Sequence, residues 1–302
     1  MDEIFLFIAL AVVGLAIGVF SGMLGIGGGT IMVPVFRLLF GMSALVSTAT
    51  SLFTIVPTSF SGALTRIRQK TCIISLGVAA GLGGACTSPV GVWLASISPA
   101  WLIMIVAAIV IAYSAVSMFT QALQLQKEEK AGRLGAEDGK PAHERPAGGQ
   151  AGESAEGEQD IHTMEQEIAS AAFKPTRKQI AIGFVIGFAA GLASGYIGVG
   201  GGFLMIPLMI HILGTTMKES SGSSLIAMII LAIPGVVSEA FLGNIDYMVG
   251  IAVAVGSIPG AIIGAHLVRR IPEGALRFTF SGFLLIAATL LILNELSHIV
   301  AF

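Results

Sequence analysis

The chain has 302 residues, of which 55% are hydrophobic and only 11% are charged, whereas an ordinary soluble domain has roughly 25% charged residues. So few charges cannot cover a soluble protein of this length, so most of its surface is expected to face lipid. The formal net charge is −2, which argues against the basic face that nucleic-acid binding requires. The expected partners are therefore the lipid bilayer and a small ligand.

The first apolar segment begins at Ile4, directly after an acidic N-terminal stretch. A secretory signal would start with a basic region and end at a small-residue cleavage site, and neither feature is visible. We therefore expect residues 4–24 to form a retained transmembrane helix. Cys72 and Cys86 lie in apolar segments without metal-motif spacing, so they are expected to be buried small hydrophobic side chains. No cofactor or metal is expected.

Apolar segments follow one another in two groups of five. A spanning helix needs about 20 apolar residues; four segments in each group reach that length, and the second is short. Short, glycine-flanked segments at matching positions of two halves are typical of a transporter's binding site. The expected segments are 4–24, 28–41, 44–65, 71–95 and 100–122, and then 179–198, 201–213, 219–241, 247–268 and 274–294.

The two groups are copies of one unit. The triple glycine Gly27–Gly29 returns as Gly200–Gly202 at an offset of 173 residues. The same offset relates further landmarks, among them Pro34 to Pro207, Ser51 to Ser224, Gly91 to Gly264 and Pro99 to Pro272. This register indicates an internal duplication. The expected organisation is a first transmembrane repeat over 1–122, a hydrophilic cytoplasmic loop over 123–176 and a second repeat over 177–302.

Basic loops indicate how the copies are oriented, because Lys and Arg near helix ends mark the cytoplasmic side. Residues 66–70 contain Arg66, Arg68 and Lys70, while the matching loop after residue 242 has no basic residue. The next loop reverses this pattern, since Arg269-Arg270 is basic and its counterpart is uncharged. With an odd number of crossings per half, we predict an all-α polytopic fold of two inverted repeats of about five membrane segments each, with both termini outside. Five crossings, or three crossings plus a re-entrant hairpin formed by the first two segments, give this parity, so the glycine-rich helices are either broken or re-entrant. Four crossings per half would instead give parallel repeats.

The connecting stretch 123–176 is rich in Glu, Ala, Gly, Lys and Pro and poor in aromatic and β-branched residues. Such a segment buries too little apolar surface to offset its ordering entropy. We expect a largely disordered loop with some helix near 164–172. A regulatory contact and a tolerated insertion both fit this composition, and the insertion is favoured.

Three successive glycines in a membrane segment call for an explanation, because each weakens a helix by roughly 1 kcal/mol relative to Ala. We predict a helix break at Gly27–Gly29 and at Gly200–Gly202. The helix that follows each break would present free N–H groups and the positive end of its dipole to an anion. Thr30 adds a hydroxyl there, and Phe203 at the equivalent place does not. Glycines spaced by four, such as Gly14, Gly18 and Gly22, are instead expected to pack helix against helix.

The third segment of each half begins with a cluster of hydroxyls. Serine and threonine in membrane helices often bond only to a backbone carbonyl one turn earlier. Four hydroxyls within five residues, at equivalent places in both copies, favour a set of donors for an oxyanion. These residues are Ser47, Thr48, Thr50 and Ser51 in the first half, and Ser220, Ser221, Ser223 and Ser224 in the second.

Ionisable residues within apolar segments are functional candidates by default. Arg37 and His211 lie late in the short segments, where reaching the interface is an equally good explanation. Glu239 and His266 lie about one turn from helix ends, where they could extend toward water. A role for Glu239 or His266 in proton coupling is the alternative.

The glycine and hydroxyl motifs resemble those of the sulfite exporter TauE/SafE family of membrane transporters. The matching motifs are Gly25-Ile-Gly27-Gly28-Gly29 followed by Pro34, Ala49-Thr50-Ser51-Leu52, Gly222-Ser223-Ser224-Leu225 and Pro259-Gly260 followed by Gly264-Ala265. The resemblance covers nearly the whole chain apart from 123–176. It implies a multi-pass protein of the cell (inner) membrane that moves sulfur oxyanions or organosulfonates such as sulfite and sulfoacetate, and we expect export by alternating access.

We therefore expect a transporter of a small anionic substrate and not an enzyme, with a homodimer left open. The candidate substrate-binding residues are Gly27, Gly28, Gly29, Thr30, Thr50, Ser51, Gly200, Gly201, Gly202, Ser223 and Ser224. Two alternative functions are a passive anion channel and an intramembrane protease. A passive anion channel has no sequence feature against it. An intramembrane protease using Ser194 and His266 is disfavoured, because the equivalent Ser21 has no matching histidine.

Overall fold

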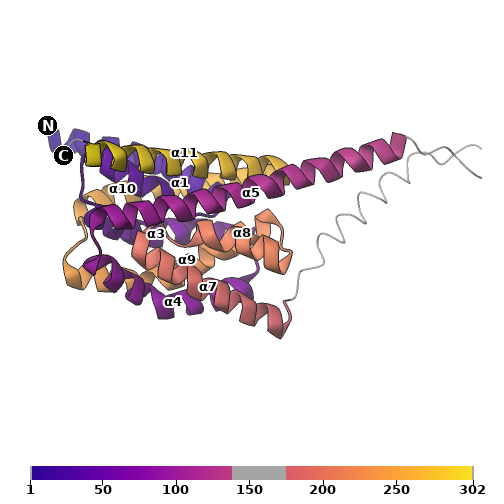
Figure 1. The fold of residues 1–302 in the computed structure, drawn as a ribbon, viewed down its shortest axis with the longest axis horizontal. Helices are drawn as coiled ribbons and strands as arrows, with labels where there is room; N and C mark the ends of the chain where they lie inside the picture. Colours follow the sequence, from indigo (N-terminus) through magenta and orange to yellow (C-terminus); the bar gives the residue numbers. More distant parts are fainter. Residues whose placement is uncertain (1, 138–174, 301–302) are drawn as a thin grey trace, which may run out of the picture.

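A computed structural model describes residues 2–137 and 175–300, and within those ranges all regular structure is helical. The helices form an elongated bundle with both termini at the same end, while α5 extends beyond the other end (Figure 1). The elements are α1 (Asp2–Leu24), α2 (Gly29–Phe40), α3 (Ala44–Arg68), α4 (Ile74–Ile97), α5 (Ala100–Glu137), α7 (Arg177–Ile197), α8 (Gly202–Leu213), α9 (Met217–Leu242), α10 (Tyr247–Leu267), the 3-10 turn η1 (Val268–Arg270) and α11 (Glu273–Val300).

The predicted helix breaks are confirmed at both glycine triplets. α1 ends at Leu24 and α2 starts at Gly29, and the second copy breaks in the same way between α7 and α8. The backbone between the helices turns through positive φ angles, for example 83° at Gly28 and 86° at Gly200. L-residues with a Cβ rarely adopt such angles, so glycine is the residue that allows these turns.

The spaced glycines bring helices of different copies into backbone contact. A Cβ atom at Gly18 of α1 would lie 2.7 Å from Cα of Ser257 in α10. A Cβ at Gly191 of α7 would lie 2.6 Å from the carbonyl carbon of Gly84 in α4. Because α1 corresponds to α7 and α10 to α4, each copy contributes one partner to each of two matching helix pairs. The packing role expected for these glycines is therefore confirmed.

The order of these contacts gives the helix directions. Along α1, Gly14 faces Val253 and Gly22 faces Ala261, so α1 and α10 run in the same direction. Along α7, Gly183 to Gly195 face Leu76 to Ser88 in ascending order, so α7 and α4 also run together.

The α3 helix packs alongside α10 in ascending order, because Thr58 bonds to Ser257 and Gly62 faces Ala261. α3 and α4 are joined by the short connection 69–73, so they run in opposite directions. Consequently α1 and its counterpart α7 run in opposite directions, as Figure 1 also shows from the N-terminus and from the start of α7. This is the geometry that inverted repeats require.

The last helices of the two copies, α5 and α11, pack on each other along one side of the bundle (Figure 1). α5 continues to Glu137, so the boundary expected at residue 122 is too early for the helix, and residues 123–137 are helical rather than disordered. The helix expected near 164–172 lies outside the described residues.

Seven helices in the described ranges are long and apolar enough to cross a membrane, and α8 is a shorter apolar helix. Many large hydrophobic side chains face outward, including Phe5 and Phe241, which are 76% and 88% exposed. An apolar exterior of this kind suits lipid as its solvent. The expectation of buried cysteines is wrong, because Cys86 is exposed on this exterior and Cys72 is only partly buried.

Candidate functional site

The two helix breaks contact each other inside the bundle. A Cβ atom at Gly29, the first residue of α2, would lie 2.5 Å from the carbonyl oxygen of Val199 in the other break. Reciprocally, a Cβ at Gly202 would lie 2.8 Å from the carbonyl oxygen of Gly25. These glycines are therefore required by the approach of the two copies as well as by the turn. Met228 of α9 and Ile55 of α3 pack against both breaks.

Two equivalent serines hold the breaks in place. Ser224 Oγ donates to the carbonyl oxygen of Gly25 at 2.7 Å, and Ser51 Oγ donates to that of Gly198. Both pairs obey the repeat offset, and both serines are buried. Each serine comes from α3 or α9 and reaches the break of the other copy. Their hydroxyl protons are therefore engaged by backbone in this conformation, which makes them positioning groups for the breaks.

Thr50 and Ser223 make a second symmetric pair of contacts. Thr50 Oγ1 accepts a hydrogen bond from the backbone N–H of Asp246 at 3.0 Å, and Ser223 Oγ accepts one from Ile73 N–H at 2.8 Å. Asp246 and Ile73 precede α10 and α4, so each bond ties one copy to the start of a helix in the other. Both hydroxyls serve as acceptors here.

Of the two remaining pairs of equivalent hydroxyls in the predicted clusters, one makes the same kind of contact in both copies and the other does not. Thr48 and Ser221 donate to carbonyls one turn earlier in their own helices, which is the ordinary pattern for membrane helices. Ser220 pairs with Thr215 at 2.7 Å, whereas its counterpart Ser47 is buried without a partner among the described residues. In this conformation the other seven hydroxyls of the two clusters all bond to protein groups.

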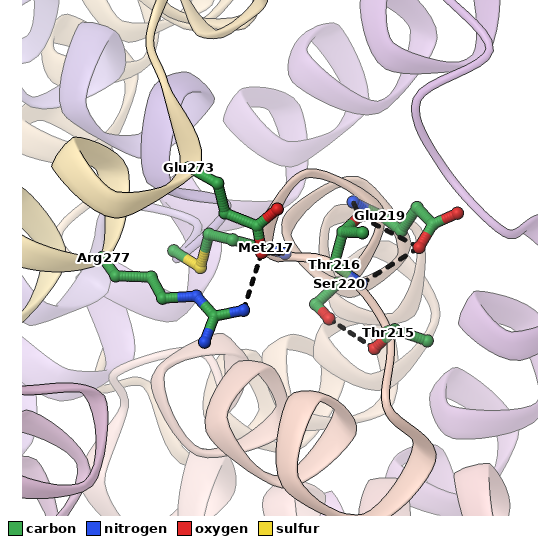
Figure 2. Close-up of polar contacts among 7 residues, drawn as sticks. All are labelled: Thr215, Thr216, Met217, Glu219, Ser220, Glu273 and Arg277. Carbon is green, nitrogen blue, oxygen red and sulfur yellow. Dashed lines mark hydrogen bonds and ion pairs between the residues drawn. The ribbon is translucent and has the colours of Figure 1, made fainter. Parts of the chain in front are cut away.

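The segment before α9 belongs to a polar cluster between α9 and α11 (Figure 2). Thr216 and Glu219 form a capping box, and Glu273 of α11 accepts from the Met217 backbone N–H at 2.9 Å. Arg277 bonds to the same Glu273 carboxylate at 2.6 Å. These contacts satisfy the orphan N–H groups of a helix start. They have a structural role, although the buried Arg277 Nε has no hydrogen-bond partner among the described residues.

Several buried hydroxyls next to the breaks have no hydrogen-bond partner among the described residues. Ser21 and its counterpart Ser194 lie in the last turns of α1 and α7, and Thr30 lies in the first turn of α2. The hydroxyls of Ser59 and Ser88 are also buried without a hydrogen-bond partner among these residues. Buried polar groups in native proteins are nearly always paired, so each orphan calls for a ligand or a water. Ser21 was not among the sequence candidates, although its repeat match to Ser194 was a usable signal.

The ionisable candidates are not brought together. Glu239 is only 1% exposed and accepts a hydrogen bond from Asn244 at 2.8 Å, so it does not extend toward water. His266 is exposed in the last turn of α10, bonded to Ile262 O. Asn244 precedes α10, which has 21 residues and is therefore about 30 Å long, so Glu239 and His266 lie at opposite ends of it. His211 is exposed, and Arg37 is partly buried.

Arg66 was predicted to lie in a basic loop, and the structure places it elsewhere. Arg66 lies inside α3 and is 0% exposed, so it does not belong to a solvated basic loop. The helix continues to Arg68, which is exposed. By the repeat offset, the counterpart of Arg66 is Glu239, so the two copies place opposite charges at equivalent buried positions.

The fold and the paired breaks define a polytopic α-helical membrane protein with two glycine-broken hairpins at its centre. The model of the sulfite exporter TauE/SafE family matches residues 10–291, and the chain belongs to that family. The resemblance drawn from the motifs is therefore confirmed, and the chain is a multi-pass membrane transporter protein of this family.

Three proteins of Bacillus subtilis (strain 168) are similar over most of their length. The probable membrane transporter protein YdhB is 26% identical, covering 86% of this chain and 90% of its own. YunE and YjnA, also described as probable membrane transporter proteins, are 24% and 23% identical and cover 87% and 94% of this chain, and 89% and 99% of their own. No solved structure matches the chain significantly.

Proposed function

We propose that the chain exports small sulfur-containing anions, namely sulfite, sulfoacetate or related organosulfonates, across the cell (inner) membrane by alternating access. The observation that carries the proposal is the contact between the two breaks, each held by a serine from the other copy. The sulfur comes from the name of the family, and the preference for an anion comes from the chemistry of the breaks.

An oxyanion would be held by neutral hydrogen-bond donors that lie close to the two breaks. The starts of α2 and α8 supply first-turn backbone N–H groups and a positive dipole end, although the N–H of Gly202 itself donates to the Gly200 carbonyl. Ser21, Thr30 and Ser194 add buried hydroxyls that have no partner among the described residues. Such neutral donors allow binding and release, which transport requires. The proposed site therefore comprises both glycine triplets, these three hydroxyls, and the four positioning residues Thr50, Ser51, Ser223 and Ser224.

Two opposed copies that meet at one site suit alternating access, because each copy can open toward one side of the membrane. Basic residues gather at the end where α3 and α10 finish and α7 begins, and they include Arg68, Lys70, Arg177, Lys178, Arg269 and Arg270. Positive charge marks the cytoplasmic side, so we assign that end, together with the segment 123–176, to the cytoplasm. Glu239, buried at the opposite end, is the candidate for proton coupling, with exposed His266 as a second.

The test is binding and flux with purified protein. Sulfite, sulfate, thiosulfate and sulfoacetate are titrated against the protein in detergent, and the best ligand is then followed in proteoliposomes. The paired variant Ser51→Ala/Ser224→Ala is compared with Ser96→Ala, an exposed serine that bonds only within its own helix. We expect the paired variant alone to lose transport while remaining folded. Normal transport by the paired variant, or no binding of any of these anions to the wild type, would contradict the proposal.

A further inference from the structure

Arg66 is the largest of the fully buried side chains in the described part of the chain. It projects from the last turns of α3, at the end assigned to the cytoplasm. A charge this deep in a membrane protein is expensive to bury and is a functional candidate by default. The question is which groups compensate its charge.

Among the described residues, only one of the three guanidinium nitrogens of Arg66 has hydrogen-bond partners. Nη2 donates to the carbonyl oxygens of Gly22 at 3.3 Å and Met23 at 3.1 Å, and to Ser221 Oγ at 2.9 Å. Gly22 and Met23 lie in the last turn of α1, whose negative dipole end favours a cation. These contacts give Nη2 a role in capping α1. The other two nitrogens, Nε and Nη1, are shielded from solvent and have no hydrogen-bond partner among the described residues.

Among the residues whose side chains are described, no carboxylate forms an ion pair with Arg66; Glu273, for example, pairs with Arg277. The neighbour that Arg66 does influence is Cys72, in the connection between α3 and α4. Burial raises the pKa of the Cys72 thiol, and the Arg66 charge only partly opposes this, so the thiol is neutral. Among the described residues, the positive charge and the donors Nε and Nη1 therefore have no anionic partner.

The position of Arg66 links it to the first break. A Cβ atom at Gly25 would lie 2.5 Å from Cβ of Ser221, the same serine that accepts from Arg66. Arg66 thus touches both α1, which leads into the break, and α9 of the other copy. An anion bound to Arg66 would therefore affect the contact between α1 and α9, which must loosen if the two copies move apart during transport.

We infer that Arg66 is an anion-binding residue at the cytoplasmic end of the transport path, where its Nε and Nη1 donate to a sulfonate or sulfite oxygen. The inference rests on the proposed function and adds a charged binding position to its neutral donors. A three-oxygen anion can accept several charge-assisted hydrogen bonds, which are stronger than bonds between neutral groups. Glu239 occupies the equivalent buried position at the opposite end, so the two ends of the bundle bury different ionisable groups.

The test compares Arg66→Met and Arg66→Lys with Arg68→Gln, an exposed arginine two residues away. Sulfoacetate affinity and the KM and kcat of transport are measured for each purified variant, together with the apparent Tm without anion. Arg66→Met should weaken sulfoacetate binding by about tenfold or more, and Arg66→Lys by less because it keeps the charge. The apparent Tm without anion is the control for folding, because Arg66→Met relieves a desolvation penalty but also removes the donor to the Gly22 and Met23 carbonyls. Arg68→Gln should match the wild type.

A second measurement leaves Arg66 intact. In a Cys86→Ser background, sulfoacetate should slow maleimide labelling of Cys72, the thiol beside Arg66. Unchanged affinity and KM in both Arg66 variants, or labelling of Cys72 that is indifferent to sulfoacetate, would overturn the inference while wild-type transport leaves the proposed function standing. A wild type that neither binds nor moves any of these anions would instead overturn the proposed function.

Discussion

The contact between the copies can be tested with two glycines that share a backbone conformation and differ in surroundings. Gly25 has φ of 76° and faces Ser221 of the other copy, where an added Cβ would meet backbone and Cβ atoms, the latter at 2.5 Å. Gly41 has φ of 60°, and an added Cβ there would meet nothing within 4 Å. Alanine at either position takes on the same strain of a left-handed conformation, about 1–2 kcal/mol. Only Gly25→Ala adds a steric clash between the copies.

The clash at Gly25 involves Cα and Cβ of Ser221, which cannot rotate away. Overpacking of this kind costs about 1–3 kcal/mol, so Gly25→Ala should be destabilised by about 2–5 kcal/mol and Gly41→Ala by about 1–2 kcal/mol. Apparent Tm in detergent and flux in proteoliposomes are the two readouts. We expect the larger fall in Tm in Gly25→Ala, and loss of flux in that variant only.

The second copy repeats the experiment independently. Gly198 has φ of 72°, and its added Cβ would lie 2.6 Å from the carbonyl oxygen of Thr48, while Gly214 has φ of 67° and nothing within 4 Å. Gly198→Ala should therefore show the larger fall in Tm and lose flux, as expected for Gly25→Ala. Gly214→Ala should show the smaller fall in Tm and keep flux, as expected for Gly41→Ala. If the contact-forming and open glycines tolerate alanine equally, the breaks are not packed tightly against α9 and α3 of the other copy, and the reasoning fails.

Three further predictions concern single side chains. Ser224→Ala removes the donor to the Gly25 carbonyl and leaves that buried oxygen unsatisfied, so it should destabilise the protein by about 1–3 kcal/mol; an unchanged Tm beside the Ser96→Ala control contradicts this. Thr30→Val removes a buried hydroxyl without a partner among the described residues, so Tm should hold or rise while anion affinity falls in the titration; a falling Tm with unchanged affinity would assign Thr30 to the fold alone. Glu239→Gln should abolish the response of flux to an imposed proton gradient if Glu239 couples protons, with His266→Gln as the comparison; a wild-type response in both variants removes the coupling role.

The local features of the fold were predictable because they depend on residue type. Three successive glycines indicated a break, and the structure places positive φ angles there at Gly27 and Gly28. Glycines spaced by four indicated close packing, and α1 and α10 meet through them. Apolar length indicated the spanning segments. Each of these rules uses only neighbours within a few turns, which a single sequence supplies.

The long-range contacts could not be predicted in the same way. Ser224 was selected as a donor for an anion, yet it donates to the carbonyl of Gly25, and only the packing of the two copies reveals that partner. Arg66 was read as a loop charge because Arg68 and Lys70 follow it. A rule that counts charges near helix ends treats all three alike, whereas the three-dimensional path of α3 buries the first and exposes the others. α5 exceeds its predicted end because Glu, Lys and Ala favour helix beyond the apolar part.

Concentrative flux through the wild-type protein tests the central claim most directly. Proteoliposomes are loaded with sulfite or sulfoacetate on one side, and net movement is followed with and without an imposed proton gradient. The account predicts transport of a sulfur oxyanion against its own gradient, at a rate that saturates with concentration. Flux that only dissipates the substrate gradient would identify a passive anion channel, and no flux of any sulfur anion would contradict the proposed substrate class.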